Sequence, residues 1–247
     1  AHVEAGLRSF DRDMPEEINR LLTDQIADSL FVTEKSGITN LKNENITDTK
    51  VFFVGNVMID SLKNHLAKAT KSNIIKNLGL NPQNYVLMTM HRPSNVDSME
   101  QLKTLVHLMN SLSDQRKVIF PIHPRTKKNM EDYSLLNTVN KNVILSDPIG
   151  YLDFLNLLQQ AELVITDSGG IQEETTYLGI QCITTRTTTE RPITVEIGTN
   201  HLVGDSYKKA EEVALDIFNG KIKKGRIPDL WDGNSADRIV KVIIDNL

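Results

Sequence analysis

The sequence predicts an α/β protein built on a parallel sheet with helices on both faces. Short apolar runs recur along the chain, amphipathic helical patterns separate them, and each run is apolar at consecutive rather than alternate positions. A strand that is apolar on both faces needs cover on both faces, which the crossover helices of a parallel sheet provide. Strands that alternate with helices therefore indicate βαβ units.

The elements can be assigned in chain order. The strands are predicted at 51–55, 85–90, 117–122, 142–146, 162–167 and 180–185. The helices are predicted at 15–28, 98–114, 150–160, 207–219 and 234–247. The first helix begins well, because Pro15 suits the first helical position and Glu16 and Glu17 fall in the first turn. The Lys- and Asn-rich segment near 56–75 marks a predicted domain boundary.

Composition limits the classes of protein to consider. The 247 residues carry a net charge of −4 and are 39% hydrophobic, which suits one large or two modest globular domains. The sequence has no basic stripe, so a nucleic-acid partner is not expected. No apolar run approaches the roughly 20 residues that a membrane span needs. The single cysteine, Cys182, excludes a disulfide within the chain and favours a reducing, cytoplasmic setting. We expect Cys182 to be a small buried residue of a strand.

The chain starts with "AHVEAGLRSF", which has no initiator Met and no signal peptide. This segment resembles the middle of a folded unit. We therefore expect a further part of the protein to precede it.

A glycine-rich segment, "TDSGGIQEE" at 166–174, follows a predicted strand and opens a helix. Backbone N–H groups at a helix start attract anions, and Gly169 and Gly170 would let a diphosphate approach closely. The alternative is an ordinary strand-to-helix turn. Glu174 can accept hydrogen bonds from a ribose diol, as acids do in nucleotide sites, or it can be a surface glutamate that favours the helix N-terminus.

Histidines and arginines follow two predicted strands. His91 and Arg92 come after 85–90, and His123 and Arg125 come after 117–122. Ligands of open α/β sheets bind at these strand ends, and a histidine there can donate to phosphate or exchange a proton. A histidine hydrogen-bonded within a loop is the alternative.

Two carboxylates lie near the start of the chain. Glu4 and Glu16 could share one cleft and divide acid and base work. Alternatively, Glu4 pairs with Arg8 or Arg12, and Glu16 only interacts with the helix dipole. Farther on, the loop at 184–204 carries Arg186 and Arg191, which suggests an anion clamp or a hydroxyl-rich surface loop.

Other chemistries find little support. The histidines are scattered, no His-x-x-x-His occurs, and the segment around Ser168 lacks the Gly-x-Ser-x-Gly of a serine nucleophile. We expect neither a metal nor an organic cofactor.

Taken together, "HVEAGLRS", "MPEEINR", "GNVMID", "HRPSN", "TDSGGIQEE" and the later "TERP" segment resemble the non-hydrolysing UDP-N-acetylglucosamine 2-epimerases, in that family's order. The resemblance implies a glycosyltransferase-B-like architecture of two Rossmann-like domains with the nucleotide sugar between them. Residues 1–62 would be the remainder of a truncated first domain and 63–232 the complete second domain. Residues 233–247 would form a helix that packs back on the first.

The resemblance also implies roles for particular residues. Ser168, Gly169 and Gly170 would hold the diphosphate, Glu174 the ribose, and Phe154 would lie by the uracil. Arg191 would lie near the same ligand. Glu4, Glu16 and His91 would be the catalytic residues.

The implied reaction inverts carbon 2 of UDP-N-acetylglucosamine without a cofactor. The carbon-2 proton leaves, UDP is eliminated to give a 2-acetamidoglucal, and UDP adds back after a proton reaches the opposite face. A homodimer is implied as well. Pro93 and Ser94 replace a charged pair found in many members, so substrate activation is not expected. A glycosyltransferase of the same architecture and a non-catalytic nucleotide-sugar binder are the alternatives.

Overall fold

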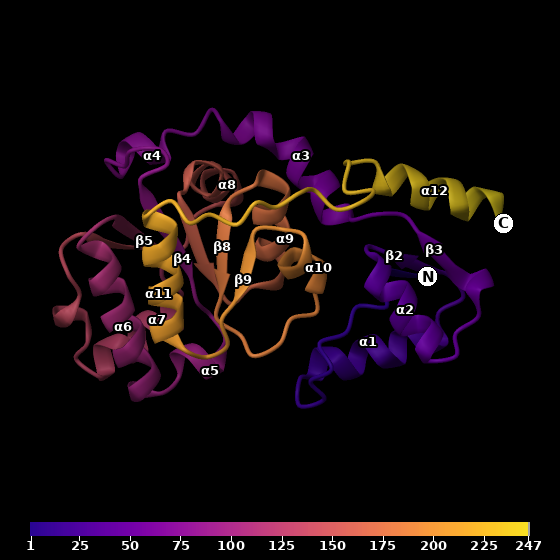
Figure 1. The fold of residues 1–247 in the computed structure, drawn as a ribbon, viewed down its shortest axis with the longest axis horizontal. Coiled ribbons are helices and arrows are strands. Elements are labelled where there is room, and N and C mark those ends of the chain that lie inside the picture. The colour runs from indigo at the N-terminus through magenta and orange to yellow at the C-terminus, as the bar shows by residue number, and fades with distance from the viewer. Residues whose placement is uncertain (247) are drawn as a thin grey trace.

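The computed structural model describes residues 1–246, which form two separate parallel sheets (Figure 1). The smaller sheet has the order β1-β2-β3, with strands His2–Ala5, Leu30–Val32 and Val51–Phe53. The larger sheet has the order β6-β5-β4-β7-β8-β9. Its strands, in chain order from β4, are Tyr85–Thr89, Lys117–Pro121, Val143–Ser146, Leu163–Thr166, Gln181–Thr184 and Asn200–Leu202.

All six strands predicted from apolar runs are confirmed, as β3 to β8. Strands β1, β2 and β9 were not predicted. Strands β1 and β9 contain polar residues, as HVEA and NHL, so they do not appear as apolar runs, and β2 has only the three residues LFV; all three are held by pairing with a neighbouring strand. Cys182 is buried in β8, as expected, and burial raises the pKa of its thiol to about 11.

The helices connect the strands and cover the sheets. In chain order α1 to α6 are Pro15–Ile26, Lys35–Asn43, Val57–Ala69, Ile74–Asn77, Pro93–Val96 and Met99–Ser113. Helices α7 to α12 are Pro124–Asp132, Tyr151–Gln160, Gly169–Leu178, Pro192–Glu196, Tyr207–Phe218 and Ser235–Asp245. The five helices predicted from the sequence are confirmed as α1, α6, α8, α11 and α12. No helix among residues 1–246 has both the length and the apolar character needed to cross a membrane.

The larger sheet is covered on both faces, as predicted. Alternate residues of β4 enter opposite cores, because side chains of a strand alternate between faces. Val86 and Met88 pack with residues of α6 and α11, whereas Tyr85 and Leu87 pack with residues of α3 and α8. This arrangement leaves the carboxyl ends of the strands uncovered by either helical layer.

Helix α3 joins the two sheets (Figure 1). Asn56, directly after β3, caps it, since Asn56 Oδ1 accepts a hydrogen bond of 2.8 Å from Met58 N. The predicted domain limit between residues 62 and 63 falls inside this helix. The domain bounds 1–62, 63–232 and 233–247 stay a prediction.

The end of the chain returns to the smaller sheet, where α12 lies beside α3 and β3 (Figure 1). The indole Nε1 of buried Trp231 donates to Thr33 O at 3.1 Å. Ala236 N donates to Asp60 Oδ2 at 2.7 Å, and Arg238 Nη1 donates to Val54 O at 3.0 Å. These contacts fix the first turns of α12 on the segment between the two sheets.

Candidate active site

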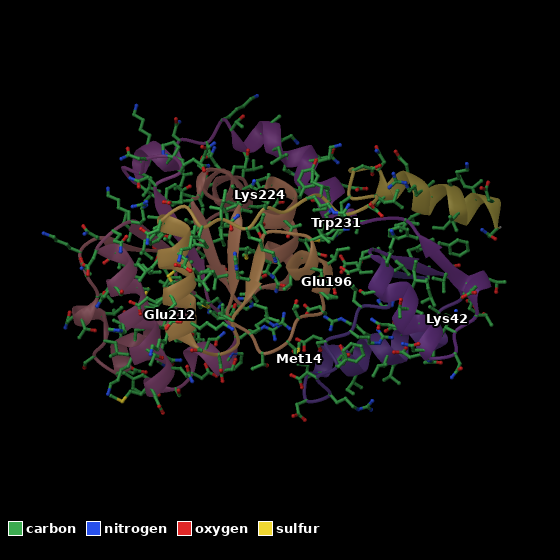
Figure 2. The ribbon with its side chains drawn as sticks, viewed as in Figure 1. Met14, Lys42, Glu196, Glu212, Lys224 and Trp231 are labelled. Carbon is green, nitrogen blue, oxygen red and sulfur yellow. The ribbon has the colours of Figure 1, made fainter. Side chains whose placement is uncertain are left out.

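A cleft of about 660 Å³ lies between the start of α1 and the carboxyl ends of β4 and β8. From the smaller-sheet side it is lined by Met14, Pro15 and Glu16, and from the larger-sheet side by His91, Arg92 and Arg186. Met14, labelled in Figure 2, bridges the two sides, because its Sδ lies 3.9 Å from Arg92 Nη1 and from Arg186 Nη2. The cleft is therefore built from both parts of the chain.

A buried aspartate fixes His91. Asp167 directly follows β7, whose neighbour β4 ends just before His91, so the two residues meet at the sheet edge. Asp167 Oδ1 lies 2.9 Å from His91 Nδ1, and Oδ2 accepts hydrogen bonds from His91 N, Arg92 N and Asn95 Nδ2. An Nδ1–H donated to Asp167 leaves Nε2 as the nitrogen available to a ligand.

This contact also sets the charges of the pair. The hydrogen bond to Asp167 raises the pKa of His91 above its usual value. Burial alone would raise the pKa of Asp167, but the hydrogen bonds from His91 and Asn95 outweigh it and lower that pKa. Sequence reasoning missed Asp167. The available signal was an acidic residue placed directly after a buried strand.

The helix start at α9 carries the two glycines for different reasons. Ser168 is the N-cap residue, and its N–H donates to Thr166 Oγ1 at 3.0 Å. A Cβ on Gly169 would lie 2.6 Å from Glu190 Oε1, so a side chain at residue 169 would require the Glu190 carboxylate to shift away from its contact with Arg186. At Gly170 the nearest atom to such a Cβ is Met58 Cε at 3.9 Å, which leaves the helix start open there.

The segment between β8 and α10 contains buried charges, so it is not simply a hydroxyl-rich surface loop. Arg186 and Arg191 are 6% and 7% exposed. Arg186 Nη2 lies 2.7 Å from Glu190 Oε2, and this pairing outweighs burial to lower the pKa of Glu190 to about 2. Within residues 1–246, Nη1 of each arginine and also Nε of Arg191 have no hydrogen-bond partner. Of the two, Arg186 lines the cleft, so its Nη1 is placed to donate to an anion there.

Glu4 has an unusual backbone. Its φ of 66° places a non-glycine residue in the left-handed region, at an irregularity in the pairing of β1 with β2. Such strain costs on the order of 1–3 kcal/mol and is typical of functional sites. Glu4 Oε2 lies 3.0 Å from Arg191 Nη2. The alternative of a pair with Arg8 is wrong, because Arg8 binds Asp24 and Glu44 instead.

The adjacent glutamates of α1 have different environments. Glu16 is exposed and lines the cleft together with His91. Glu17 is buried and accepts hydrogen bonds from Ser9 N and Phe10 N, both at 2.9 Å. The structure thus brings Glu16 and His91 to one cleft. Glu4 lies deeper, against Arg191, and is not among the residues that line the cleft.

The chain is similar to proteins of a known family over nearly its whole length. A family model described as UDP-N-acetylglucosamine 2-epimerase matches residues 1–244. The UDP-N-acetylglucosamine 2-epimerase of Methanocaldococcus jannaschii is 44% identical over 250 residues, which cover 98% of this chain and 68% of the relative. The chain belongs to the UDP-N-acetylglucosamine 2-epimerase family.

Solved structures of 2-epimerases have the same fold. The crystal structure of the Methanocaldococcus jannaschii UDP-GlcNAc 2-epimerase in complex with UDP-GlcNAc and UDP matches with a TM-score of 0.86 at 43% identity. The match covers 99% of this chain and 68% of that chain. The likeness confirms the expected glycosyltransferase-B-like architecture. A relative from Pseudomonas aeruginosa, a UDP-2,3-diacetamido-2,3-dideoxy-D-glucuronate 2-epimerase, is 42% identical over 83% of this chain and 56% of its own length.

The residues expected to bind the nucleoside of a 2-epimerase substrate lie on α8 and α9. Glu174 is 5% exposed and accepts a hydrogen bond of 3.2 Å from Tyr151 Oη. Burial raises the pKa of Glu174. Phe154, one turn along α8 from Tyr151, is half-buried against the core. Tyr151 was not singled out from the sequence, although it stands in the same segment as Phe154.

The second His–Arg pair does not line this cleft of the 2-epimerase. His123 Nδ1 accepts a hydrogen bond from Arg125 N and caps α7, and Arg125 Nη2 lies 2.6 Å from Asp97 Oδ2. His123 is therefore the alternative case that the sequence allowed, a histidine hydrogen-bonded within its own loop. Among residues 1–246, no group of three or more His, Cys, Asp or Glu side chains is placed to hold a metal ion.

Proposed function

We propose that this protein converts UDP-N-acetylglucosamine to UDP-N-acetylmannosamine by inverting carbon 2. One observation carries the proposal: the cleft that holds Glu16 and the His91–Asp167 pair is also lined by Arg186, a buried guanidinium with an unpaired N–H. Groups that can move protons therefore lie beside a group that can bind a diphosphate. Family membership supplies the substrate and the reaction type.

The reaction needs an acid and a base on opposite faces of the sugar. One carboxylate of Glu4 and Glu16 takes the proton from carbon 2, and the bond from carbon 1 to the UDP oxygen breaks to give the glucal. UDP then adds back to carbon 1 as a proton reaches the other face of carbon 2. Positioned acids and bases of this kind contribute roughly 10²–10⁴-fold each.

The departing UDP carries the negative charge that develops. His91, whose pKa is raised by the hydrogen bond to Asp167, is suited to stabilise that charge, because a fixed donor in a cleft requires no solvent reorganisation. Ser168, Gly169 and Gly170 are proposed to hold the diphosphate at the start of α9, and Arg191 lies close by. Bound in this way, the leaving group would stay close to the glucal until it adds back.

The nucleoside would lie farther along α8 and α9. Glu174 would accept hydrogen bonds from the ribose, replacing the one from Tyr151, and Phe154 would lie by the uracil. The sugar carried by the UDP is the least constrained part of the proposal, because the Pseudomonas aeruginosa relative is named for a diacetamido-glucuronate.

The homodimer stays a prediction from the resemblance, and the cytoplasmic location stays a prediction from the single cysteine. Because assembly is a prediction, activity should be measured on the complete gene product.

The deciding experiment is proton NMR of the complete gene product with UDP-N-acetylglucosamine in heavy water. We expect the manno epimer to form with deuterium at carbon 2. Transfer of the sugar to an acceptor would indicate a glycosyltransferase, and binding without turnover would indicate a passive binder. Either result would overturn the proposal.

A further inference from the structure

Glu173, next to the proposed ribose ligand, is a fully buried acid. Its Oε1 accepts a hydrogen bond of 2.8 Å from Asn56 Nδ2 and lies 2.7 Å from Arg191 Nε. Within residues 1–246, its Oε2 has no hydrogen-bond partner. One carboxyl oxygen thus makes both contacts, and the other makes none.

These contacts form a chain that crosses the molecule. Asn56 is fixed because its own Oδ1 caps α3, which directs its Nδ2 at Glu173. Arg191 Nε lies 2.7 Å from Glu173 Oε1 without a hydrogen bond between them, and Nη2 reaches Glu4 Oε2 at 3.0 Å. The order is Asn56, Glu173, Arg191, Glu4. It starts between the two sheets and ends on the strained residue of β1.

We propose that Glu173 is a positioning residue for the reaction, which fixes Arg191 against Glu4 and so places a catalytic carboxylate and a substrate-binding guanidinium together. This role presupposes the proposed function, since it gives Glu4 and Arg191 their parts in the reaction. Neither the sequence motif nor the family name assigns a role to Glu173. Its neighbour Glu174 lies toward Tyr151 instead.

The charges around Arg191 indicate how Glu173 can act without competing with Glu4. Four carboxylates, of Glu173, Glu4, Glu190 and Glu34, lie close enough to raise the pKa of Arg191. A buried carboxylate with an unpaired oxygen is costly, and the burial of several beside a single cation is more so. Burial raises the pKa of Glu173 to about 8, even though Arg191 opposes the change.

A proton on Oε2, the oxygen without a partner, removes this cost and leaves both contacts at Oε1 in place. Glu173 then acts as a neutral acid at neutral pH. Glu4 remains as the ion-pair partner of Arg191.

Two variants test this directly. Glu173→Gln keeps an oxygen that can face Asn56 and Arg191 and adds no charge, so it should retain activity within about 3-fold. Glu173→Ala removes the bridge, and kcat should fall by about 10²-fold, the loss expected when a reacting group moves by about 1 Å. Glu212→Ala, on the exposed face of α11 and labelled in Figure 2, is the matched control.

The readouts separate positioning from general damage. Both kcat and KM are measured on the complete gene product, with deuterium exchange at carbon 2. Rescue of activity by Glu173→Gln relative to Glu173→Ala is expected. If Glu173→Ala does not fold, Glu173→Met fills the space without an oxygen and is expected to show the same loss. Full activity in the Ala or Met variant, or a Gln variant as impaired as Ala, would overturn the proposal.

A second readout does not depend on turnover. The Nε chemical shift of Arg191 in nitrogen-15 NMR, without substrate, should be nearly the same in the wild type and in Glu173→Gln, and should move in Glu173→Ala, because Glu173 Oε1 lies 2.7 Å from Nε. An inactive wild type that shows this pattern would contradict the proposed function alone. An active wild type whose Arg191 signal is the same in all variants would contradict the positioning role alone.

Discussion

The imidazole Nδ1 of His91 lies 2.9 Å from a carboxylate oxygen of Asp167, a residue with no exposed surface. The same carboxylate accepts hydrogen bonds from the backbone N–H groups of His91 and Arg92. Asp167 therefore fixes both the ring and the chain that carries it.

Replacement of Asp167 should change the pH range of the enzyme. In the wild type the pKa of His91 is raised, so the imidazolium persists to a higher pH than in a free histidine. Asp167→Asn removes the negative charge, which lowers that pKa and moves the alkaline limb of the kcat/KM profile to lower pH. Activity should also fall by roughly 10²–10⁴-fold, the usual range for a positioned acid or base.

The measurement is a pH–rate profile together with an NMR titration of His91. Asp132→Asn, on the exposed side of α7, is the control and should leave both unchanged. An alkaline limb that stays in place in Asp167→Asn would show that His91 does not act as the imidazolium.

The fold could be predicted largely from the sequence because the strands of the larger sheet are buried on both faces. Such strands appear as continuous apolar runs. The contacts that complete the site could not be predicted in this way. His91 and Asp167 stand 76 residues apart in the sequence, and only the neighbouring positions of β4 and β7 bring them together.

The ion pairs of the site also could not be predicted from the sequence. From sequence proximity, Arg8 is a natural partner for Glu4. In the folded chain Arg8 pairs with Asp24 and Glu44, and Glu4 reaches Arg191 from the other sheet. The left-handed backbone of Glu4 has no sequence signal, because only glycine favours that region strongly.

Glu174 should contribute to nucleotide binding. Glu174→Ala in the complete gene product is expected to weaken UDP binding by roughly 1.5–3 kcal/mol, the range for hydrogen bonds to charged groups. Calorimetry measures the change, with Glu131→Ala on the exposed side of α7 as the control. An unchanged affinity would remove Glu174 from the ribose site. Tyr151→Phe separates the effect of the neighbouring hydroxyl.

Stability should fall as the pH rises through the neutral range. Burial raises the pKa of Glu34 to about 7 and that of Glu173 to about 8, from a usual 4.5. Between the usual pKa of 4.5 and these raised values, the folded chain binds protons that the unfolded chain has lost, so the free energy of unfolding decreases as the pH rises. The decrease begins near pH 4.5 and ends near pH 8.

Thermal unfolding of the wild type and of Glu173→Gln checks this. The variant has no proton to lose at this position, so its Tm should decrease less between pH 5 and pH 8. Glu212→Gln is the exposed control and should follow the wild type. Parallel Tm curves for wild type and Glu173→Gln would show that Glu173 is ionised throughout this range.

The adjacent glutamates of α1 allow chemistry and stability to be separated. Glu16 lines the cleft, whereas Glu17 is buried and holds the loop at Ser9 and Phe10. Glu16→Gln keeps the size of the side chain but loses its basicity, so deuterium exchange at carbon 2 should slow by about 10²–10⁴-fold with little change in Tm. Glu4→Gln should slow exchange by a similar factor.

Glu17→Gln should have the opposite signature, since it weakens hydrogen bonds from buried donors. A loss of about 1–3 kcal/mol in the free energy of unfolding is expected. Exchange is followed by NMR in heavy water and stability by denaturant unfolding, on the complete gene product. If Glu16→Gln exchanged at the wild-type rate, Glu16 would not be a proton carrier, and the elimination mechanism would have to rely on Glu4 and His91 among the residues proposed here.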